Sequence, residues 1–156
     1  MHRMDYLPIS RARRFLSAAL AGAAFWSAAC QAGILDVGGA WTDDNGKTVS
    51  LSRWQGRYTV LTMSTGACRK ICTTTLRRME QLQAIADQRH LRMEFLVIGL
   101  DPRSDTPKAW REYRLDHKLA RENWNFVSGD DERTRRVAEM LGISYWFYDE
   151  HLLHDF

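Results

Sequence analysis

The sequence predicts an α/β domain built on an open parallel sheet, and three observations carry this prediction. Strand-like apolar segments at residues 58–64, 93–100 and 124–127 alternate with segments of helical periodicity. The segment 93–100 is apolar almost throughout, as in a parallel strand buried on both faces. Cys68 and Cys72 stand where the first strand passes into a helix. Because open α/β sheets place their sites at the carboxyl ends of strands, we expect the chemistry of the protein at these thiols.

Length and composition describe one globular domain with a terminal extension. The chain has 156 residues, of which 45% are hydrophobic and 26% charged, as in ordinary globular proteins. The net charge of +3 belongs to the extension, because residues 1–29 hold four arginines and one aspartate while the remainder is neutral. Neither a nucleic acid nor an acidic partner is therefore implied.

The first 32 residues have the organisation of an export signal. Arg13 and Arg14 end a basic segment, and residues 15–29 form a short apolar stretch of small residues. This stretch is too short to span a bilayer comfortably, and an uncleaved anchor stays open as an alternative. We expect residues 33–40 to be a linker and residues 41–156 to form the domain.

Two kinds of processing stay open for this signal. Ser27, Ala28 and Ala29 before Cys30 resemble a lipoprotein cleavage box, with Ser27 in place of the usual leucine and lipid then carried on Cys30. The alternative is ordinary cleavage near Ala29 or Ala32. Either outcome places the domain on the periplasmic side of the bacterial cytoplasmic membrane, lipid-anchored or soluble. Two neighbouring cysteines oxidise there unless they are kept reduced or hold a metal.

Turn and strand signals define the first half of the domain. Asn45-Gly46 lies between two short β-like arms within residues 41–51, which is the strongest hairpin signal in the chain. Residues 53–56 then turn the chain into the strand at residues 58–64. After the cysteines, apolar residues recur at helical spacing up to about Arg89, so a helix packs on the sheet.

Capping signals define the second half. Either Thr106 or Asp105 caps a helix that has Pro107 in its first turn and runs to about Leu119. The next helix stops at Gly142. An aspartate begins that helix, and the two candidates are Asp130 and Asp131.

The last residues are predicted to be extended at 143–147 and to end in a loop at 149–156, which carries His151 and His154. The whole order is a β-hairpin followed by β-α-β-α-β-α. This order predicts a thioredoxin-like fold.

The spacing of Cys68 and Cys72 permits two kinds of chemistry. If the helix begins near Cys68, the two residues lie one turn apart on one face, close enough for a disulfide or for two thiolates on one soft metal ion. The helix N-terminus, Arg69 and Lys70 all favour the thiolate form, so we expect lowered thiol pKa values. The alternative is that both cysteines are small buried apolar residues.

Two acidic residues follow the second strand. Asp101 and Asp105 are a candidate pair of metal-binding carboxylates. We favour turn formation and helix capping instead, with a supporting role beside a metal left open. Among the aromatic residues, most are expected in the core, and residues 145–148 are a candidate docking face for a partner.

Together these motifs resemble the SCO/SenC family over residues 41–156. They are Cys68-Arg-Lys-Ile-Cys72 after one strand, Asp-Pro-Arg-Ser-Asp-Thr-Pro at 101–107 after the next, and a late histidine. The resemblance implies a thioredoxin-like fold, copper bound by two cysteines and one histidine, and a role in assembling the copper site of cytochrome c oxidase. Some members of the family also act as thiol-disulfide reductases. Matched position by position, the ligands are Cys68, Cys72 and His154, with His151 as the rival imidazole.

The donor set agrees with this implication, because two thiolates and one imidazole suit Cu(I), which prefers soft sulfur. The chain also departs from the family. Arg69 and Thr73 replace the prolines usual around the cysteines, and the chain stops at Phe156, where the family continues into a further hairpin and a closing helix. We therefore expect a C-terminally truncated domain.

Our leading functional hypothesis is an exported copper metallochaperone that binds Cu(I) or Cu(II). Its partners would be an apo cytochrome c oxidase subunit, a thioredoxin-like reductant, and the membrane through its signal or lipid anchor. The alternative is a periplasmic thiol-disulfide oxidoreductase, in which Cys68 attacks and Cys72 resolves. A truncated product without activity is the third hypothesis.

Overall fold

A computed structural model describes residues 33–66, 72–149 and 151–155, and the fold is that of the unit Ala32–Phe156. The predicted export signal at residues 1–32 lies outside the described residues. Among those residues, no helix is both long and apolar enough to cross a membrane.

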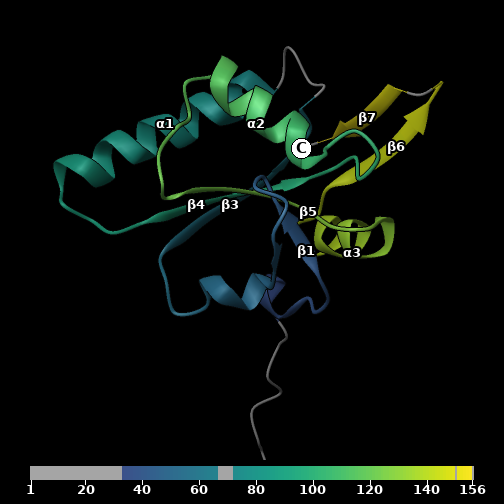
Figure 1. Ribbon diagram of the computed structural model, residues 1–156, viewed down its shortest axis with the longest axis horizontal. Coiled ribbons are helices and arrows are strands. Elements are labelled where there is room, and N and C mark those ends of the chain that lie inside the picture. Colours follow the sequence, from purple (N-terminus) through teal and green to yellow (C-terminus); the bar gives the residue numbers. More distant parts are fainter. Residues whose placement is uncertain (1–32, 67–71, 150, 156) are drawn as a thin grey trace, which may run out of the picture. The chain divides into compact units, whose positions relative to one another are not determined.

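A five-stranded sheet in the order β2-β1-β5-β4-β3 forms the centre of the domain (Figure 1). The strands β3 (Thr59–Ser64), β4 (Glu94–Gly99) and β5 (Trp124–Ser128) are parallel, as predicted. The hairpin of β1 (Trp41–Asp43) and β2 (Thr48–Val49) extends the sheet, because β1 pairs antiparallel with β5. The sheet is therefore mixed and not purely parallel.

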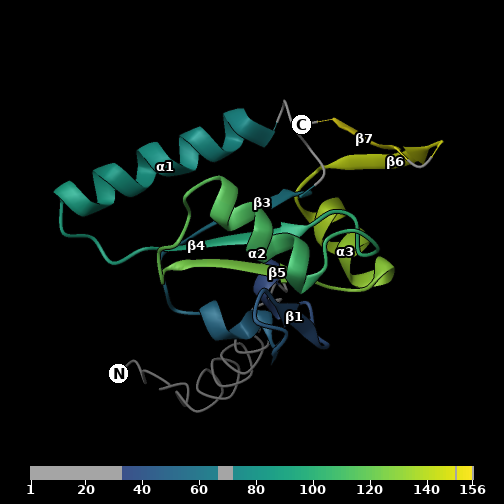
Figure 2. The same cartoon turned by 45° about the horizontal axis from the view of Figure 1, so that its top comes forward.

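Helices cover both faces of this sheet. On one face lie α1 (Cys72–Gln88) and α2 (Pro107–Asp116), and on the other lie α3 (Asp131–Met140) and the short helix η2 (Leu51–Trp54) (Figure 2). The 3-10 turn η1 (Ile34–Asp36) packs with η2.

The alternation of side chains along β4 separates two hydrophobic cores. Phe95 and Val97 face α1 and α2, whereas Leu96 and Ile98 face the opposite side. The first core is rich in aromatic rings, and the Phe95 and Trp124 rings stack at 4.9 Å between centroids. All four β4 side chains are at most 2% exposed, as the apolar sequence of this strand predicts.

The capping alternatives are resolved by hydrogen bonds. Thr106 Oγ1 accepts from the backbone N–H of Ala109 at 3.2 Å, so Thr106 caps α2. Asp130 accepts from the N–H of Arg133 at 2.9 Å and caps α3. The helix α2 ends at Asp116, before the predicted end near residue 119.

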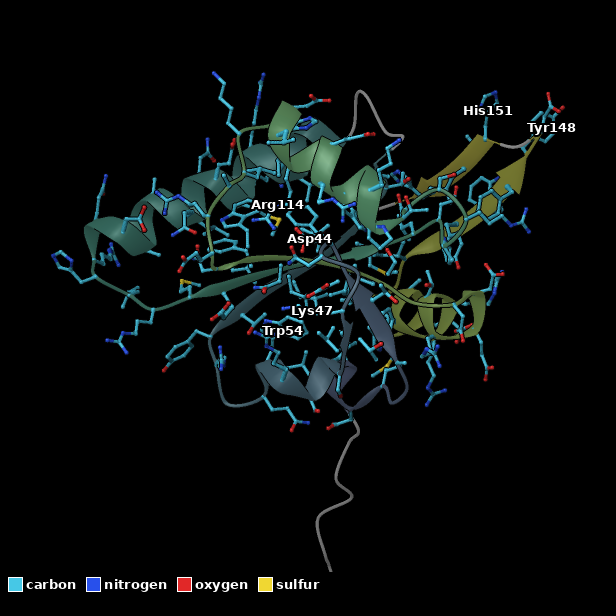
Figure 3. All side chains as sticks on the ribbon, in the orientation of Figure 1. Asp44, Lys47, Trp54, Arg114, Tyr148 and His151 are labelled. Atoms are coloured by element: carbon cyan, nitrogen blue, oxygen red, sulfur yellow. The ribbon has the colours of Figure 1, made fainter. Side chains whose placement is uncertain are left out.

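An ion pair joins the β1–β2 hairpin to α2. Asp44, in the turn after β1, forms a short contact with Arg114 of α2, and both side chains are largely buried (Figure 3). Arg111 also donates to the Asp44 carbonyl at 2.5 Å. Arg114 in addition donates to the carbonyls of Leu119 and Arg121 and lies over the Phe126 ring.

The strands β6 (Ser144–Tyr148) and β7 (His151–Asp155) form a separate antiparallel hairpin. The extended segment at 143–147 is confirmed, but the prediction of a terminal loop was wrong. Apolar cross-strand pairs explain the difference, since Trp146 lies opposite Leu153 and Phe147 lies opposite Leu152.

Candidate metal and thiol site

The connection between β3 and α1 carries the cysteines. The strand ends at Ser64 and is followed by Thr65 and Gly66, and α1 begins at Cys72. The strand-to-helix connection therefore lies in the part of the chain where the sequence predicts it. Cys68 lies in residues 67–71, outside the described residues, and Cys72 is described by its backbone alone. Whether the two cysteines share one helical turn thus stays a prediction.

Asp105 joins this connection to the neighbouring loop after β4. Its Oδ1 accepts from Thr65 Oγ1 at 3.0 Å and from the Gly66 N–H at 2.8 Å. Its Oδ2 accepts from the Asp101 N–H at 2.9 Å. Asp105 thus bonds both to its own loop and to the last described residues before the cysteine segment.

Burial dominates the electrostatics of this carboxyl group. Asp105 is only 1% exposed, and desolvation raises its pKa to about 6, against the opposing effect of the hydrogen bonds from Asp101, Gly66 and Thr65. The sequence hypothesis of helix capping does not describe Asp105, since Thr106 caps α2. Asp101 does form a turn, because its Oδ1 accepts from the Arg103 N–H at 3.1 Å.

His154 lies on β7, directly opposite Tyr145 of β6, and is half-buried. Because side chains alternate along a strand, His154 shares one face of the hairpin with Tyr145 and Phe147. On this face the Arg103 guanidinium lies 5.7 Å from the Phe147 ring centroid, and Tyr145 belongs to the core. The His154 face of the hairpin is thus the one that meets the loop after β4.

The rival histidine has a different position. His151 pairs with Tyr148 next to the hairpin turn, and both residues are exposed. Figure 3 shows them at the far tip of the hairpin. By contrast, β7 runs from this tip back toward the body of the domain in both views of the ribbon. The geometry therefore favours His154 over His151 as the histidine of the candidate site.

The described residues alone do not contain a complete metal site. Among them, no group of three or more His, Cys, Asp or Glu side chains could hold a metal ion. The two expected thiolates lie outside that search, so the ligand set Cys68, Cys72 and His154 stays a prediction. The donor chemistry fits Cu(I), as soft thiolates and an imidazole are its preferred ligands.

A cavity of about 720 Å³ opens at the other end of the parallel strands. It is bordered by charged residues that precede or flank the strands, and Arg57 is paired there with Glu94 at 3.0 Å. Asp87 and Arg121 form a second ion pair of 2.8 Å at the same cavity. This cavity lies away from the carboxyl ends of the strands and is separate from the candidate site.

Sequence comparison identifies the relatives of this chain. A family profile described as SCO1/SenC matches residues 36–151, which is most of the domain. The chain belongs to the SCO1/SenC family.

Individual members of the SCO1/SenC family show the extent of the similarity. The mitochondrial protein SCO2 of Saccharomyces cerevisiae is 32% identical over 117 residues, which cover 71% of this chain and 36% of the yeast protein. The SCO1 homolog of Bacillus subtilis is 25% identical over 87 residues, 56% of this chain and 45% of that protein. The chain thus spans less than half of the length of these two relatives.

Solved structures confirm the thioredoxin-like fold expected of a SCO1/SenC protein. A SCO1/SenC family lipoprotein from Bacillus anthracis matches with a TM-score of 0.67 at 19% identity, over 75% of this chain and 71% of that one. Arabidopsis thaliana ScoI, solved with copper bound, matches with a TM-score of 0.61 at 24% identity, over 76% of each chain. At these identities the likeness concerns the fold.

Proposed function

We propose that this protein is an exported copper metallochaperone that holds Cu(I) on Cys68, Cys72 and His154. Membership of the SCO1/SenC family supports the proposal, and solved relatives from Arabidopsis thaliana, Bradyrhizobium japonicum and yeast contain copper. A further solved relative is described as a member of the Sco family of cytochrome c oxidase assembly proteins. The copper acceptor in our proposal is accordingly an apo subunit of cytochrome c oxidase.

The observation that carries the proposal is the position of His154. It lies on the hairpin face that meets the loop after β4, and Asp105 of that loop bonds to Thr65 and Gly66, directly before the cysteine segment. An imidazole approaching from the hairpin and two thiolates from the strand-to-helix connection supply three ligands from two sides. A three-coordinate Cu(I) site leaves room for an incoming ligand of an acceptor protein, so copper can pass by stepwise ligand exchange.

Export determines what else the site needs. In an oxidising compartment the two thiols form a disulfide unless a reductant keeps them reduced, so a thioredoxin-like reductant is part of the proposal. The domain is held at the outer side of the bacterial cytoplasmic membrane through its signal or through lipid on Cys30. A SCO1/SenC relative from Bacillus anthracis described as a lipoprotein supports the lipid form.

The experiment is an anaerobic Cu(I) titration of the reduced protein against a competing chelator. We expect one tight equivalent that is lost in Cys68→Ser and Cys72→Ser. His154→Ala should weaken binding by about tenfold or more. His151→Ala, on the same strand at the exposed tip, is the matched control and should bind copper as the wild type does. Equal affinities for the wild type and His154→Ala would remove His154 from the site.

A thiol-disulfide oxidoreductase is the second candidate function. A solved Sco relative, 22% identical over 65% of this chain, is described as containing a disulfide switch. In this mechanism the Cys68 thiolate attacks a partner disulfide and releases one partner thiol. Cys72 then attacks the mixed disulfide, which releases the second thiol and leaves Cys68 and Cys72 oxidised. This function requires no imidazole, so His154→Ala should leave reductase activity and the reduction potential of the pair unchanged.

A further inference from the structure

We infer that Asp105 is a positioning residue for the cysteine pair, because it fixes the end of β3 from which the cysteine segment departs. This inference rests on the proposed function for the role of the thiols in binding copper. Its structural basis lies entirely in described residues.

The first argument is how Asp105 distributes its hydrogen bonds. Only one of the three donors, the Asp101 N–H, belongs to its own loop. The other two, Thr65 Oγ1 and the Gly66 N–H, are 40 and 39 residues away in the sequence. The local loop does not need these two bonds, whereas they hold the strand end that leads to Cys68.

The second argument is that Asp105 is itself held from a third strand. The Ser128 hydroxyl, at the end of β5, donates to the Asp105 backbone carbonyl at 2.5 Å. The same hydroxyl accepts from the indole N–H of Trp110, which is fully buried in α2. Asp105 is therefore held in place through its backbone by Ser128, and its hydrogen bonds connect the ends of β3, β4 and β5.

The third argument is the space made for this carboxylate. Gly99 is the last residue of β4, and a Cβ placed there would lie 2.9 Å from both Cβ and Oδ2 of Asp105. A side chain at residue 99 would displace Asp105 from its position. The absence of a side chain at Gly99 thus leaves the space that the buried Asp105 carboxylate occupies.

A general structural role would not explain this geometry. Thr106 caps α2 and Asp101 forms the adjoining turn, so the local backbone already has its side-chain partners. What Asp105 adds is the bond across the sheet to Thr65 and Gly66. The effect of losing it should therefore concentrate on the cysteines.

The test uses Asp105→Asn in the full chain. An amide has a single acceptor oxygen, so it cannot serve the Gly66 and Asp101 N–H groups together. We expect hydrogen exchange to become at least tenfold faster at Gly66 or at Asp101, whichever N–H the amide nitrogen then faces. Alkylation rates at Cys68 and Cys72, resolved by mass spectrometry, should change at least threefold relative to the wild type. Cu(I) affinity should fall by about tenfold or more.

Thr106→Ala is the matched control, since it removes the cap of α2 next to Asp105 without touching the Thr65 and Gly66 bonds. It should lower stability and leave alkylation of Cys68 and Cys72 within twofold of the wild type. If Asp105→Asn does not fold, Thr65→Val removes one cross-sheet bond, and Thr65→Ser restores it. We expect faster exchange and altered alkylation in the valine variant and wild-type behaviour in the serine variant.

The outcomes separate this inference from the proposed function. Failure of the wild type to bind Cu(I) would refute the copper proposal, while exchange and alkylation would still decide the role of Asp105. A folded Asp105→Asn protein with faster exchange at Gly66 and wild-type alkylation rates at Cys68 and Cys72 would overturn the inference. So would a Thr106→Ala protein that changed these rates as much.

Discussion

Asp105 is a residue at which burial outweighs the hydrogen bonds that favour the charged carboxylate. Burial of the carboxyl group raises its pKa from 3.8 to about 6, although three hydrogen bonds favour the charged form. The folded state therefore binds more protons than the unfolded state between about pH 4 and pH 6. Stability from this group is fully present below the lower value and is lost as the pH rises through the higher one.

We predict that the wild-type protein loses about 3 kcal/mol of unfolding free energy relative to Asp105→Asn between about pH 4 and pH 6, because a pKa difference of this size has that value. Chemical denaturation of both proteins across this range measures it. Two pH profiles that run parallel would show that Asp105 is not the titrating group.

Arg114 is the second residue with a large predicted effect. Its partner Asp44 has a side chain that is 8% exposed, and that of Arg114 itself is 19% exposed. Arg114→Ala leaves the buried carboxylate without its ion-pair partner and should cost about 3 kcal/mol in denaturant unfolding. Lys108→Ala is the control, because its ion pair with Glu112 is exposed and should contribute below about 1 kcal/mol. Equal losses in the two variants would contradict the importance of burial.

At single residues, the sequence predicted which kinds of role occur, such as helix caps, better than which residue fills each role. Thr106 and Asp105 both looked suitable as caps, and only the hydrogen bonds separated them. The bond between Asp105 and Asp101 is a loop contact of the kind the sequence predicts, whereas the contact between residues 66 and 105 has no local signal. The family resemblance favoured His154 over His151, and the pairing register of β7 places the two on opposite faces.

Among the elements, β4 shows most directly how close packing restricts the residue type at one position. Gly99→Ala places a methyl group 2.9 Å from the Asp105 side chain, and we expect a loss of about 1–3 kcal/mol from this overpacking. Gly38→Ala is the matched control, because a Cβ there meets no atom within 4 Å. It should be neutral or slightly stabilising. Thermal or urea unfolding measures both, and a harmless Gly99→Ala would show that the loop after β4 can shift.

Elements with local signals were predicted closely, and elements defined by distant pairing were not. The Asn45-Gly46 turn, the apolar β4 segment and the Asp130 cap each depend on neighbouring residues and are found in place. The pairing of β1 with β5 depends on residues far apart, so the sequence left the position of the first hairpin undefined. The strand β7 was missed because its polar ends resemble a loop.

Across the domain, protection from exchange should follow burial. The interior strand β4 is paired on both sides and buried on both faces, so its amides should exchange only through global unfolding. The β6–β7 hairpin has only two strands and exposes Trp146, Tyr148 and Leu153, so local opening should release its amides first. Native-state hydrogen exchange at increasing denaturant measures the order. Identical opening free energies for the two regions would contradict this prediction.

The pairing of β1 with β5 has a consequence for how the chain acquires its shape during synthesis. Trp41 in β1 and Trp54 in η2 are at most 2% exposed in the finished domain, yet the strand that β1 joins is translated long after them. At about 5–20 residues per second the ribosome needs on the order of ten seconds to reach β5. During that interval the earliest segment of the domain has no sheet to join. The β1–β2 hairpin is thus synthesised first but is among the last elements to complete its pairing. Until then Trp41 and Trp54 lack part of their cover and can promote aggregation.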